Sequence, residues 1–130
     1  MDLNEYYGAD PKELSTLSLA YIGDAVFELM VRTELLSRFN TTAGNLHKKA
    51  KGLVNAKAQA NMYFRIENKL TEQEAAVFKR GRNAKSATVP KNADVSDYRH
   101  ATGLEAVFGY LYLAGNFERL KFLMQEGLEI

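Results

Sequence analysis

Two carboxylates stand out because each lies inside an otherwise apolar stretch. Residues 18–32 read SLAYIGDAVFELMVR, where Asp24 directly follows Gly23, and residues 101–115 read ATGLEAVFGYLYLAG, where Glu105 is the only charge. A buried, unpaired carboxylate is costly, so it must be neutralised, paired with a cation or bound to a metal. If the two segments cross, the two acids could face each other, and a shared proton or a bridging divalent cation would relieve their repulsion.

These acids have a structural interpretation as well as a metal-binding one. Arg32, Arg99 and His100 are candidate partners for buried ion pairs. Ligation by oxygen alone would instead suit Mg²⁺ or Mn²⁺ and not zinc. Glu28, one turn after Asp24, could support such a metal, bind it directly, or form a structural ion pair.

The elements that must position these acids are helices, because the chain shows no sustained alternation and no hairpin turn. An N-cap, a proline at the first helical position and a capping-box acid at Asp10-Pro11-Lys12-Glu13 predict a helix over about residues 11–37. Further helices are expected over about residues 42–68, 71–80 and 96–115, and from Asn116 to the C-terminus. Residues 81–95 predict a long loop that is either functional or disordered.

The helix that carries Asp24 is apolar on two sides. At 100° per residue its own side carries Leu17, Ala20, Tyr21, Glu28 and Val31, and the opposite side carries Ile22, Val26 and Leu29. A helix of this kind is central and buried. We therefore expect Asp24 to be at least partly desolvated.

Composition limits the class of protein. A chain of 130 residues that is 46% hydrophobic and 25% charged fits one globular domain, and we expect residues 1–130 to form a single all-α domain. Cysteine is absent, which excludes disulfides, thiolate zinc sites and a cysteine nucleophile. The sequence has no apolar run of membrane-spanning length and no signal-peptide layout, so a cytoplasmic location is expected.

Positive charge is concentrated in the middle of the chain. Residues 35–91 hold 12 Lys and Arg against 3 Asp and Glu, although the net charge of the whole chain is only +1. Such a block indicates a surface that binds a polyanion, and Arg side chains with loop amides suit phosphate oxygens. Alternatively, these residues form a solvated helix face and a flexible loop. The candidate RNA-binding residues are Lys48, Lys49, Lys51, Lys79, Arg80, Arg82, Asn83, Lys85 and Lys91.

No other catalytic pattern is present. His47 and His100 are the only histidines, and both fit ordinary polar contacts better than a role as catalytic base. Nothing resembles a Ser-His-Asp set, a Walker loop or a dinucleotide fingerprint. A carboxylate metal site beside a basic surface points to phosphodiester hydrolysis by a metal-activated water.

Several long motifs resemble one family. LAYIGDAVFE is similar to the Gly-Asp signature helix of the ribonuclease III family, and ATGLEAVFGYLYL to that family's second acidic helix. The stretches LHKKAKGLVNAKAQA, KRGRNAKSATVPKNADV and YRHATGLEA resemble specifically the Mini-III branch, which lacks the double-stranded-RNA-binding domain. The resemblance covers essentially the whole chain, and the motifs agree in order and spacing.

The resemblance implies an all-α ribonuclease III-like endonuclease domain of about five main helices, without a separate RNA-binding domain. It further implies a homodimer that cuts double-stranded RNA with Mg²⁺, or with Mn²⁺ as a substitute. The expected products carry 5′-phosphate and 3′-hydroxyl ends, and the expected substrate is the 23S ribosomal RNA precursor. Asp24 and Glu105 match the family's catalytic metal ligands.

The sequence also departs from full-length ribonuclease III. Ala20 stands where that family has a glutamate, and Thr102 where it has an aspartate. Mini-III proteins share both losses, which supports the subfamily. Fewer carboxylates put in doubt how many metal ions the site holds, and they leave Thr102 as a candidate to support the site indirectly.

Two alternatives compete with the endoribonuclease. The first is a non-catalytic helical module that binds double-stranded RNA, in which Asp24 and Glu105 are structural. The second is a helical protein-interaction domain whose basic surface binds an acidic protein.

Overall fold

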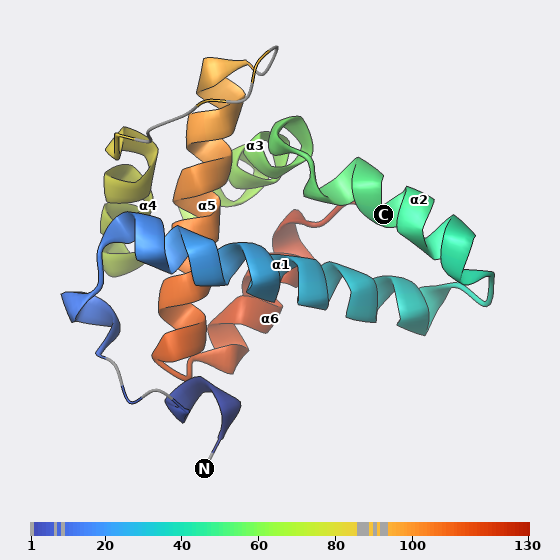
Figure 1. Cartoon of the computed structure of the whole chain (residues 1–130), viewed down its shortest axis with the longest axis horizontal. Helices are drawn as coiled ribbons and strands as arrows, with labels where there is room; N and C mark the ends of the chain where they lie inside the picture. The colour runs from blue at the N-terminus through green and yellow to red at the C-terminus, as the bar shows by residue number, and fades with distance from the viewer. Residues whose placement is uncertain (1, 7, 9, 86–88, 90, 92–93) are drawn as a thin grey trace.

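All regular structure in the described part of the chain is helical (Figure 1). The computed structural model describes residues 2–6, 8, 10–85, 89, 91 and 94–130. Its α-helices are α1 (Thr16–Arg38), α2 (Ala43–Val54), α3 (Ala56–Ile66), α4 (Glu72–Asn83), α5 (Val95–Leu113) and α6 (Phe117–Gly127), and its 3₁₀ turns are η1 (Leu3–Glu5), η2 (Pro11–Glu13) and η3 (Glu67–Lys69). The predicted all-α class is therefore confirmed.

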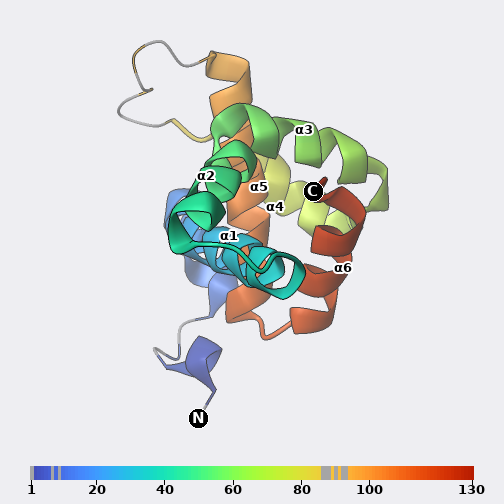
Figure 2. The same cartoon turned by 90° about the vertical axis from the view of Figure 1, so that its right-hand side faces the viewer.

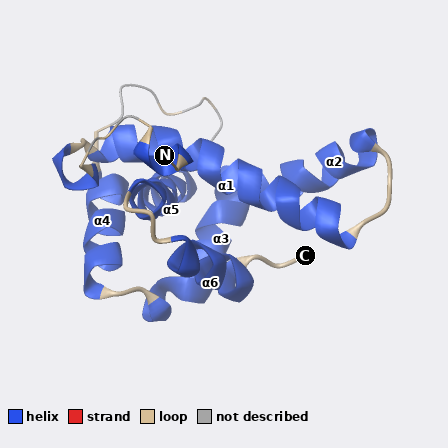
Figure 3. Cartoon of the chain, turned by 90° about the horizontal axis from the view of Figure 1, so that it is seen from below, coloured by secondary structure: helices blue, strands red, loops and turns tan. Residues whose placement is uncertain are grey.

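Helix α5 is the centre of the fold. Its residues from Ala101 to Leu111 are buried except for the half-buried Glu105, as expected for a helix that is apolar on every side. Helices α1, α3 and α4 pack around it, which is clearest where α5 is seen nearly end-on (Figure 3). At the crossing of α1 and α5, the rings of Phe27 and Phe108 meet edge to face with centroids 5.3 Å apart.

The C-terminal part of α1 and helix α2 form a hairpin that extends away from α5 (Figures 1 and 3). Leu35 and Ala50 are buried where the two helices meet, whereas Leu36 on the outer side of α1 is exposed. A view along this arm places α2 in front of the α1–α5 crossing, with α6 at one side (Figure 2). The arm and helix α4 lie at opposite ends of the molecule (Figure 1).

The helix predicted over residues 42–68 is in fact two helices. Asn55 has extended backbone angles (φ −71°, ψ 160°), ends α2 and caps α3 by accepting a hydrogen bond from the backbone N–H of Ala58. An asparagine side chain competes well for backbone N–H groups, so it can restart a helix in a new direction. Lys57, on α3, therefore does not share a helix with Lys48 and Lys51, which lie on α2.

Other helix boundaries follow their local signals. The Thr71/Glu74 capping box is present, Asn116 caps α6, and Gly115 (φ +74°) follows α5 in the left-handed conformation. Two boundaries differ from the prediction. Pro11 starts only a 3₁₀ turn, since Ser15 caps α1 anew, and α4 continues to Asn83 and so takes the first part of the predicted loop.

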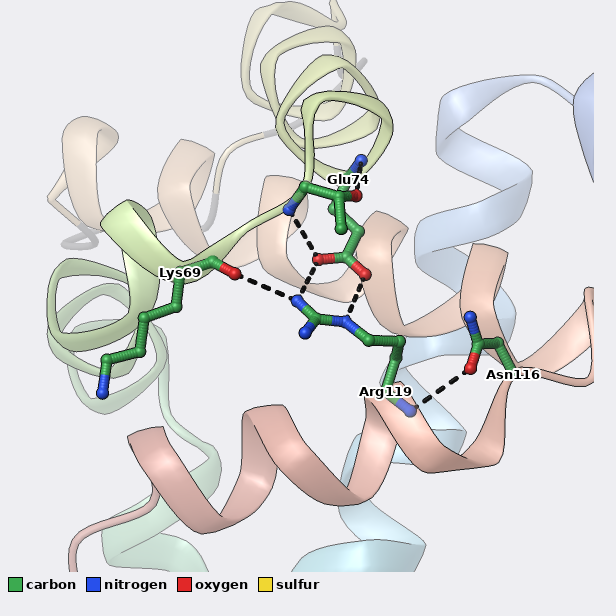
Figure 4. Close-up of polar contacts among 5 residues, drawn as sticks. Lys69, Glu74, Asn116 and Arg119 are labelled. Carbon is green, nitrogen blue, oxygen red and sulfur yellow. Dashed lines mark hydrogen bonds and ion pairs between the residues drawn. The ribbon is translucent and has the colours of Figure 1, made fainter.

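An ion pair between Arg119 and the buried Glu74 joins three segments of the chain (Figure 4). The guanidinium of Arg119 on α6 donates to both carboxylate oxygens of Glu74 on α4, at 2.7 and 2.9 Å, and to the backbone oxygen of Lys69. The hydrogen bonds with Glu74 hold the pKa of Arg119 above its usual range. Because Glu74 is only 3% exposed, loss of Arg119 would leave a buried carboxylate without its compensating charge.

Within the described residues, no helix is long and apolar enough to span a membrane.

Candidate active site

The candidate site depends on a close backbone contact between α1 and α5. A Cβ atom added to Gly23 would lie 1.7 Å from the backbone oxygen of Glu105, and one added to Gly109 would lie 2.0 Å from the backbone oxygen of Leu19. Only glycine allows two helix backbones to approach this closely. Since Gly23 precedes Asp24, the same contact brings Asp24 next to Glu105.

The carboxyl groups of Asp24 and Glu105 interact directly, as the sequence predicted for crossing helices. The pKa of Glu105 is raised from 4.5 to about 8, first by burial, then by the charge of Asp24 and by a hydrogen bond with it. A hydrogen bond from Gln59 acts in the opposite direction. At neutral pH, without a cation, Glu105 therefore keeps its proton beside Asp24.

The expected desolvation holds for only one member of this pair. Glu105 is half-buried, but Asp24 is exposed. The prediction for Asp24 was wrong because the packed surface of α1 covers only part of this side: Ala20 and Val31 are buried, whereas Tyr21 is 83% exposed. Asp24 itself is exposed, so solvent and ligands can reach the pair.

The structural alternative of buried ion pairs with Arg or His is not what the fold shows. Within the described segments, neither Asp24 nor Glu105 forms a salt bridge. Arg32 instead pairs with Glu28 at 2.7 Å, one turn away on the exposed side of α1. Glu28 thus has the ion-pair role that the sequence left open.

Thr102, one turn before Glu105, makes its hydrogen bond within α5. Its hydroxyl donates to the backbone oxygen of Tyr98 on its own helix, which is a common arrangement for a buried threonine. Among the residues that the structure describes, no third His, Asp or Glu joins Asp24 and Glu105.

The residue that sequence reasoning missed is Gln59. Its Nε2 lies 3.4 Å from Oε2 of Glu105, and the side chain is only 3% exposed. One signal was available, because Gln59 precedes Met62 and Ile66 at the i, i+3, i+7 spacing of a core-facing stripe. A polar side chain in such a buried stripe needs a hydrogen-bond partner.

The donor set fits a hard divalent cation. Mg²⁺ usually takes one or two protein carboxylates and completes its octahedral shell with water and substrate phosphates. Asp24 and Glu105 supply two such carboxylates on a solvent-open side, and a proton held between them is what a cation would replace.

We predict that Glu105 makes the metal-free protein less stable as the pH rises. The unfolded chain loses this proton near pH 4.5 and the folded protein only near pH 8, so stability falls between these values. Relative to the parent protein, Glu105→Gln should gain on the order of 1–3 kcal/mol between pH 5 and pH 9, allowing for partial solvent contact. Urea unfolding in EDTA measures this gain, and a difference between the two proteins that stays constant with pH would contradict it.

The candidate RNA-binding residues form two groups. Lys48, Lys49 and Lys51 lie on α2 in the arm, and the others lie on α4 and beyond it, at the opposite end (Figure 1). All are exposed except Arg82, which is half-buried. The two groups therefore do not form one patch on this chain. Part of the predicted loop (residues 86–88, 90, 92 and 93) lies outside the described residues.

Several of these basic side chains also have contacts within the protein. Lys49 lies over the ring of Phe39 at 4.3 Å, and the guanidinium of Arg82 lies 5.9 Å from the ring centre of Phe78. Arg82 Nε also donates to Asn83. These contacts hold the stems in place and leave charge at the surface.

His100 has a structural environment, in line with the sequence-based interpretation. Its Nδ1 lies 2.7 Å from the backbone oxygen of Ser96, and its ring packs beside Tyr63, Phe64 and Phe78.

Comparison with known proteins agrees with this geometry. The Ribonuclease III domain family matches residues 17–116, which include both α1 and α5. The chain is 49% identical over 117 residues to Mini-ribonuclease 3 of Thermoanaerobacter sp. (strain X514), covering 90% of this chain and 82% of that protein. It is also 49% identical over 122 residues to Mini-ribonuclease 3 of Clostridium tetani (strain Massachusetts / E88), covering 93% and 81%.

A solved structure shares the fold. The crystal structure of a protein from Fusobacterium nucleatum aligns with a TM-score of 0.80 at 38% identity, covering 89% of this chain and 93% of that chain. The family match, the relatives and the shared fold agree with the crossing of α1 and α5 at glycines. The chain therefore belongs to the ribonuclease III family of endoribonucleases, with the Mini-ribonuclease 3 proteins among its relatives.

Proposed function

We propose that this endoribonuclease cuts double-stranded RNA and depends on Mg²⁺, with Asp24 and Glu105 as its metal ligands. The observation that carries the proposal is the contact between these two carboxyl groups, of which Asp24 is exposed to solvent. When bound, Mg²⁺ would lower the pKa of a water molecule and stabilise negative charge on the attacked phosphate, with Mn²⁺ as a possible substitute.

The residues of the chain have separate tasks in this proposal. Asp24 and Glu105 hold the cation, and the raised pKa of Glu105 makes its ionised form favourable only when a cation is there to compensate. The basic groups on α2 and α4 contact the phosphate backbone, which gives affinity without base specificity.

The direct test is a cleavage assay on labelled duplex RNA with and without Mg²⁺. We expect cutting only with the cation, and products with 5′-phosphate and 3′-hydroxyl ends. If the protein binds duplex RNA but never cuts it with any divalent cation, the proposal fails in favour of a non-catalytic RNA-binding module.

We predict that the C-terminal end of α4 contributes phosphate contacts. Arg80→Ala and Arg82→Ala should each weaken duplex binding and reduce the slope of log affinity against log salt by about one. Lys121→Ala, an exposed basic residue on α6, is the matched control and should leave the slope unchanged. Equal slopes for the parent and both arginine variants would remove α4 from the RNA contact.

We further propose that the protein is a homodimer. Leu17, Tyr21, Leu29 and Leu36 are 39–83% exposed and lie within about 120° on one side of α1. Such a row of exposed apolar residues marks an interface, and a two-fold pair would bring two Asp24–Glu105 sites to one duplex, one for each strand.

We predict that Leu29→Lys produces a monomer. A charge placed in the apolar row cannot be desolvated without large cost, so light scattering after size exclusion should show half the parent's mass. Leu3→Lys, an equally exposed leucine outside α1, should leave the mass unchanged. A parent protein that is monomeric at the concentrations at which it cuts RNA would contradict the dimer.

The natural substrate is proposed from the family resemblance and the Mini-ribonuclease 3 relatives to be the 23S ribosomal RNA precursor, with the protein acting in the cytoplasm. Mapping 23S RNA ends in cells that lack the protein tests this, because the precursor extensions should accumulate.

A further inference from the structure

Gln59 is a polar residue at a position where the fold calls for an apolar one. Helix α3 packs on α5 and α6, and its buried stripe is formed by Gln59, Met62 and Ile66, each of which is at most 3% exposed. Met62 and Ile66 belong to the main hydrophobic core. The stripe would be continuous if residue 59 were also apolar.

A buried amide is costly to keep unless it makes a hydrogen bond. The partner of this amide is Oε2 of Glu105, which lies 3.4 Å from Nε2 of Gln59. This distance is at the long end of hydrogen bonds, as is common for catalytic groups before substrate and cofactor are bound. The amide therefore sits behind the carboxylate, on the protein side, while Asp24 contacts it from the solvent side.

The position of Gln59 also depends on the break between α2 and α3 at Asn55. If residues 42–68 formed one continuous helix, residue 59 would follow the direction of α2 along the arm. Because Asn55 caps a new helix, α3 runs against α5, and Gln59 in its second turn reaches Glu105. The contact between residues 59 and 105 spans 46 positions in the sequence.

We propose that Gln59 is a positioning residue, which donates its amide N–H to Glu105 and so fixes that carboxylate in the orientation required to bind the divalent cation with Asp24. This inference rests on the proposed function, since it assigns a task within the same site. Groups that hydrogen-bond metal ligands from behind typically change metal affinity or activity by about 10–100-fold when they are removed.

A purely structural role predicts a different outcome. If Gln59 only filled space, an unbranched apolar residue of similar length would replace it without loss, and Met62 shows that methionine fits this stripe. Gln59→Met keeps the volume and removes the donor. Stability and metal binding then separate the two roles.

The matched control is Gln73→Met. The amide of Gln73 on α4, an exposed residue, also donates one hydrogen bond to α5, to the hydroxyl of Tyr110, which lies five positions after Glu105 and on a different face of that helix. Both variants thus lose one hydrogen bond from a side-chain amide to α5, and only Gln59→Met loses it at Glu105.

The experiment measures three quantities in the full chain. Calorimetric titration with Mn²⁺ in the absence of RNA gives the metal affinity, steady-state cleavage gives kcat, KM and the Mg²⁺ concentration for half-maximal activity, and thermal unfolding gives stability. For Gln59→Met we expect a folded protein, about 10–100-fold weaker Mn²⁺ binding and a matching rise in the Mg²⁺ requirement. The KM for duplex RNA should stay within about twofold, since the phosphate contacts are unchanged.

A folded Gln59→Met protein with the metal affinity and Mg²⁺ requirement of Gln73→Met would overturn the inference. Should Gln59→Met fail to fold, the NMR signals of the glutamine side-chain amides test the inference instead. The resonances of the Gln59 amide must shift in Glu105→Ala while those of Gln73 stay in place, and an unshifted Gln59 amide overturns the inference.

Failure of the proposed function gives a different result. If the parent protein cuts RNA and binds Mn²⁺, and Gln59→Met does both equally well, only the role of Gln59 is disproved. A parent protein that neither cuts duplex RNA nor binds Mn²⁺ removes the proposed function and the role of Gln59 together.

Discussion

Asp24→Asn should reduce cleavage of duplex RNA by about 10³-fold or more while the protein stays folded. The substitution keeps the shape of the side chain and removes one of the two carboxylates that are proposed to hold the cation. A loss of about 4 kcal/mol of charge stabilisation at the reacting phosphate corresponds to a factor of about 10³ in rate. Single-turnover cleavage at saturating Mg²⁺ measures the loss.

The fold should tolerate this change. Asp24 is exposed and raises the pKa of Glu105 through its charge, so an uncharged residue at position 24 relieves repulsion. In metal-free buffer Asp24→Asn is expected to be at least as stable as the parent protein. It should also bind duplex RNA at least as tightly, since a negative charge has been removed.

Glu34→Gln is the matched control, because it makes the same carboxylate-to-amide change on the same helix. Glu34 pairs with Arg38 at 3.1 Å and lies ten positions after Asp24 on α1. We expect its activity to stay within a few-fold of the parent's. Full cleavage by Asp24→Asn would show that the metal ligands have been wrongly assigned.

Gly23→Ala should have the largest effect on folding. The added Cβ would lie 1.7 Å from the backbone oxygen of Glu105, 2.6 Å from its carbonyl carbon and 2.8 Å from the backbone nitrogen of Gly109. All three are backbone atoms, so no change of side-chain rotamer relieves the clash, and α1 and α5 must move apart. We expect a loss of more than about 4 kcal/mol in the free energy of unfolding, or no soluble folded protein.

Gly52→Ala provides the comparison. Gly52 also lies within a helix, but a Cβ added there has no atom within 4 Å. Replacing a glycine inside a helix by alanine usually stabilises it, here by about 0.5–1 kcal/mol. Urea unfolding of both variants checks the prediction, and equal stabilities would mean that the two helices are not in backbone contact.

Any Gly23→Ala protein that does fold tests how the crossing serves the site. Separation of α1 from α5 moves Asp24 away from Glu105, so cleavage should fall more than stability alone explains. Stability and activity are linked at this position because one contact both closes the core and joins the two carboxylates.

Much of the helical structure could be predicted because helix boundaries depend on neighbouring residues. The capping box at Thr71 and Glu74 and the Asn116 cap involve residues three positions apart, so the sequence displays them directly. The same locality explains the failure at Asn55. Asn55 can cap a new helix or stand inside a continuous one, and packing of α3 on α5 favours the turn.

The sequence alone pointed to the two residues that we propose as metal ligands. An aspartate after Gly23 and a single glutamate in a second apolar segment were enough to suggest a crossing and a metal site. What the sequence could not show is which side of α1 faces solvent, because a periodic pattern reports that a side is apolar and not whether this chain or another covers it. Asp24 was therefore expected to be desolvated, whereas it is exposed.

Only the tertiary structure decided the surroundings of the two acids. The contact of Gln59 with Glu105 and the ion pair of Glu74 with Arg119 join residues 46 and 45 positions apart. No local signal specifies such partners, since each pairing follows from how separate helices pack around α5. Helix caps and acid positions are properties of short segments, whereas burial, pKa and hydrogen-bond partners arise only when distant segments meet.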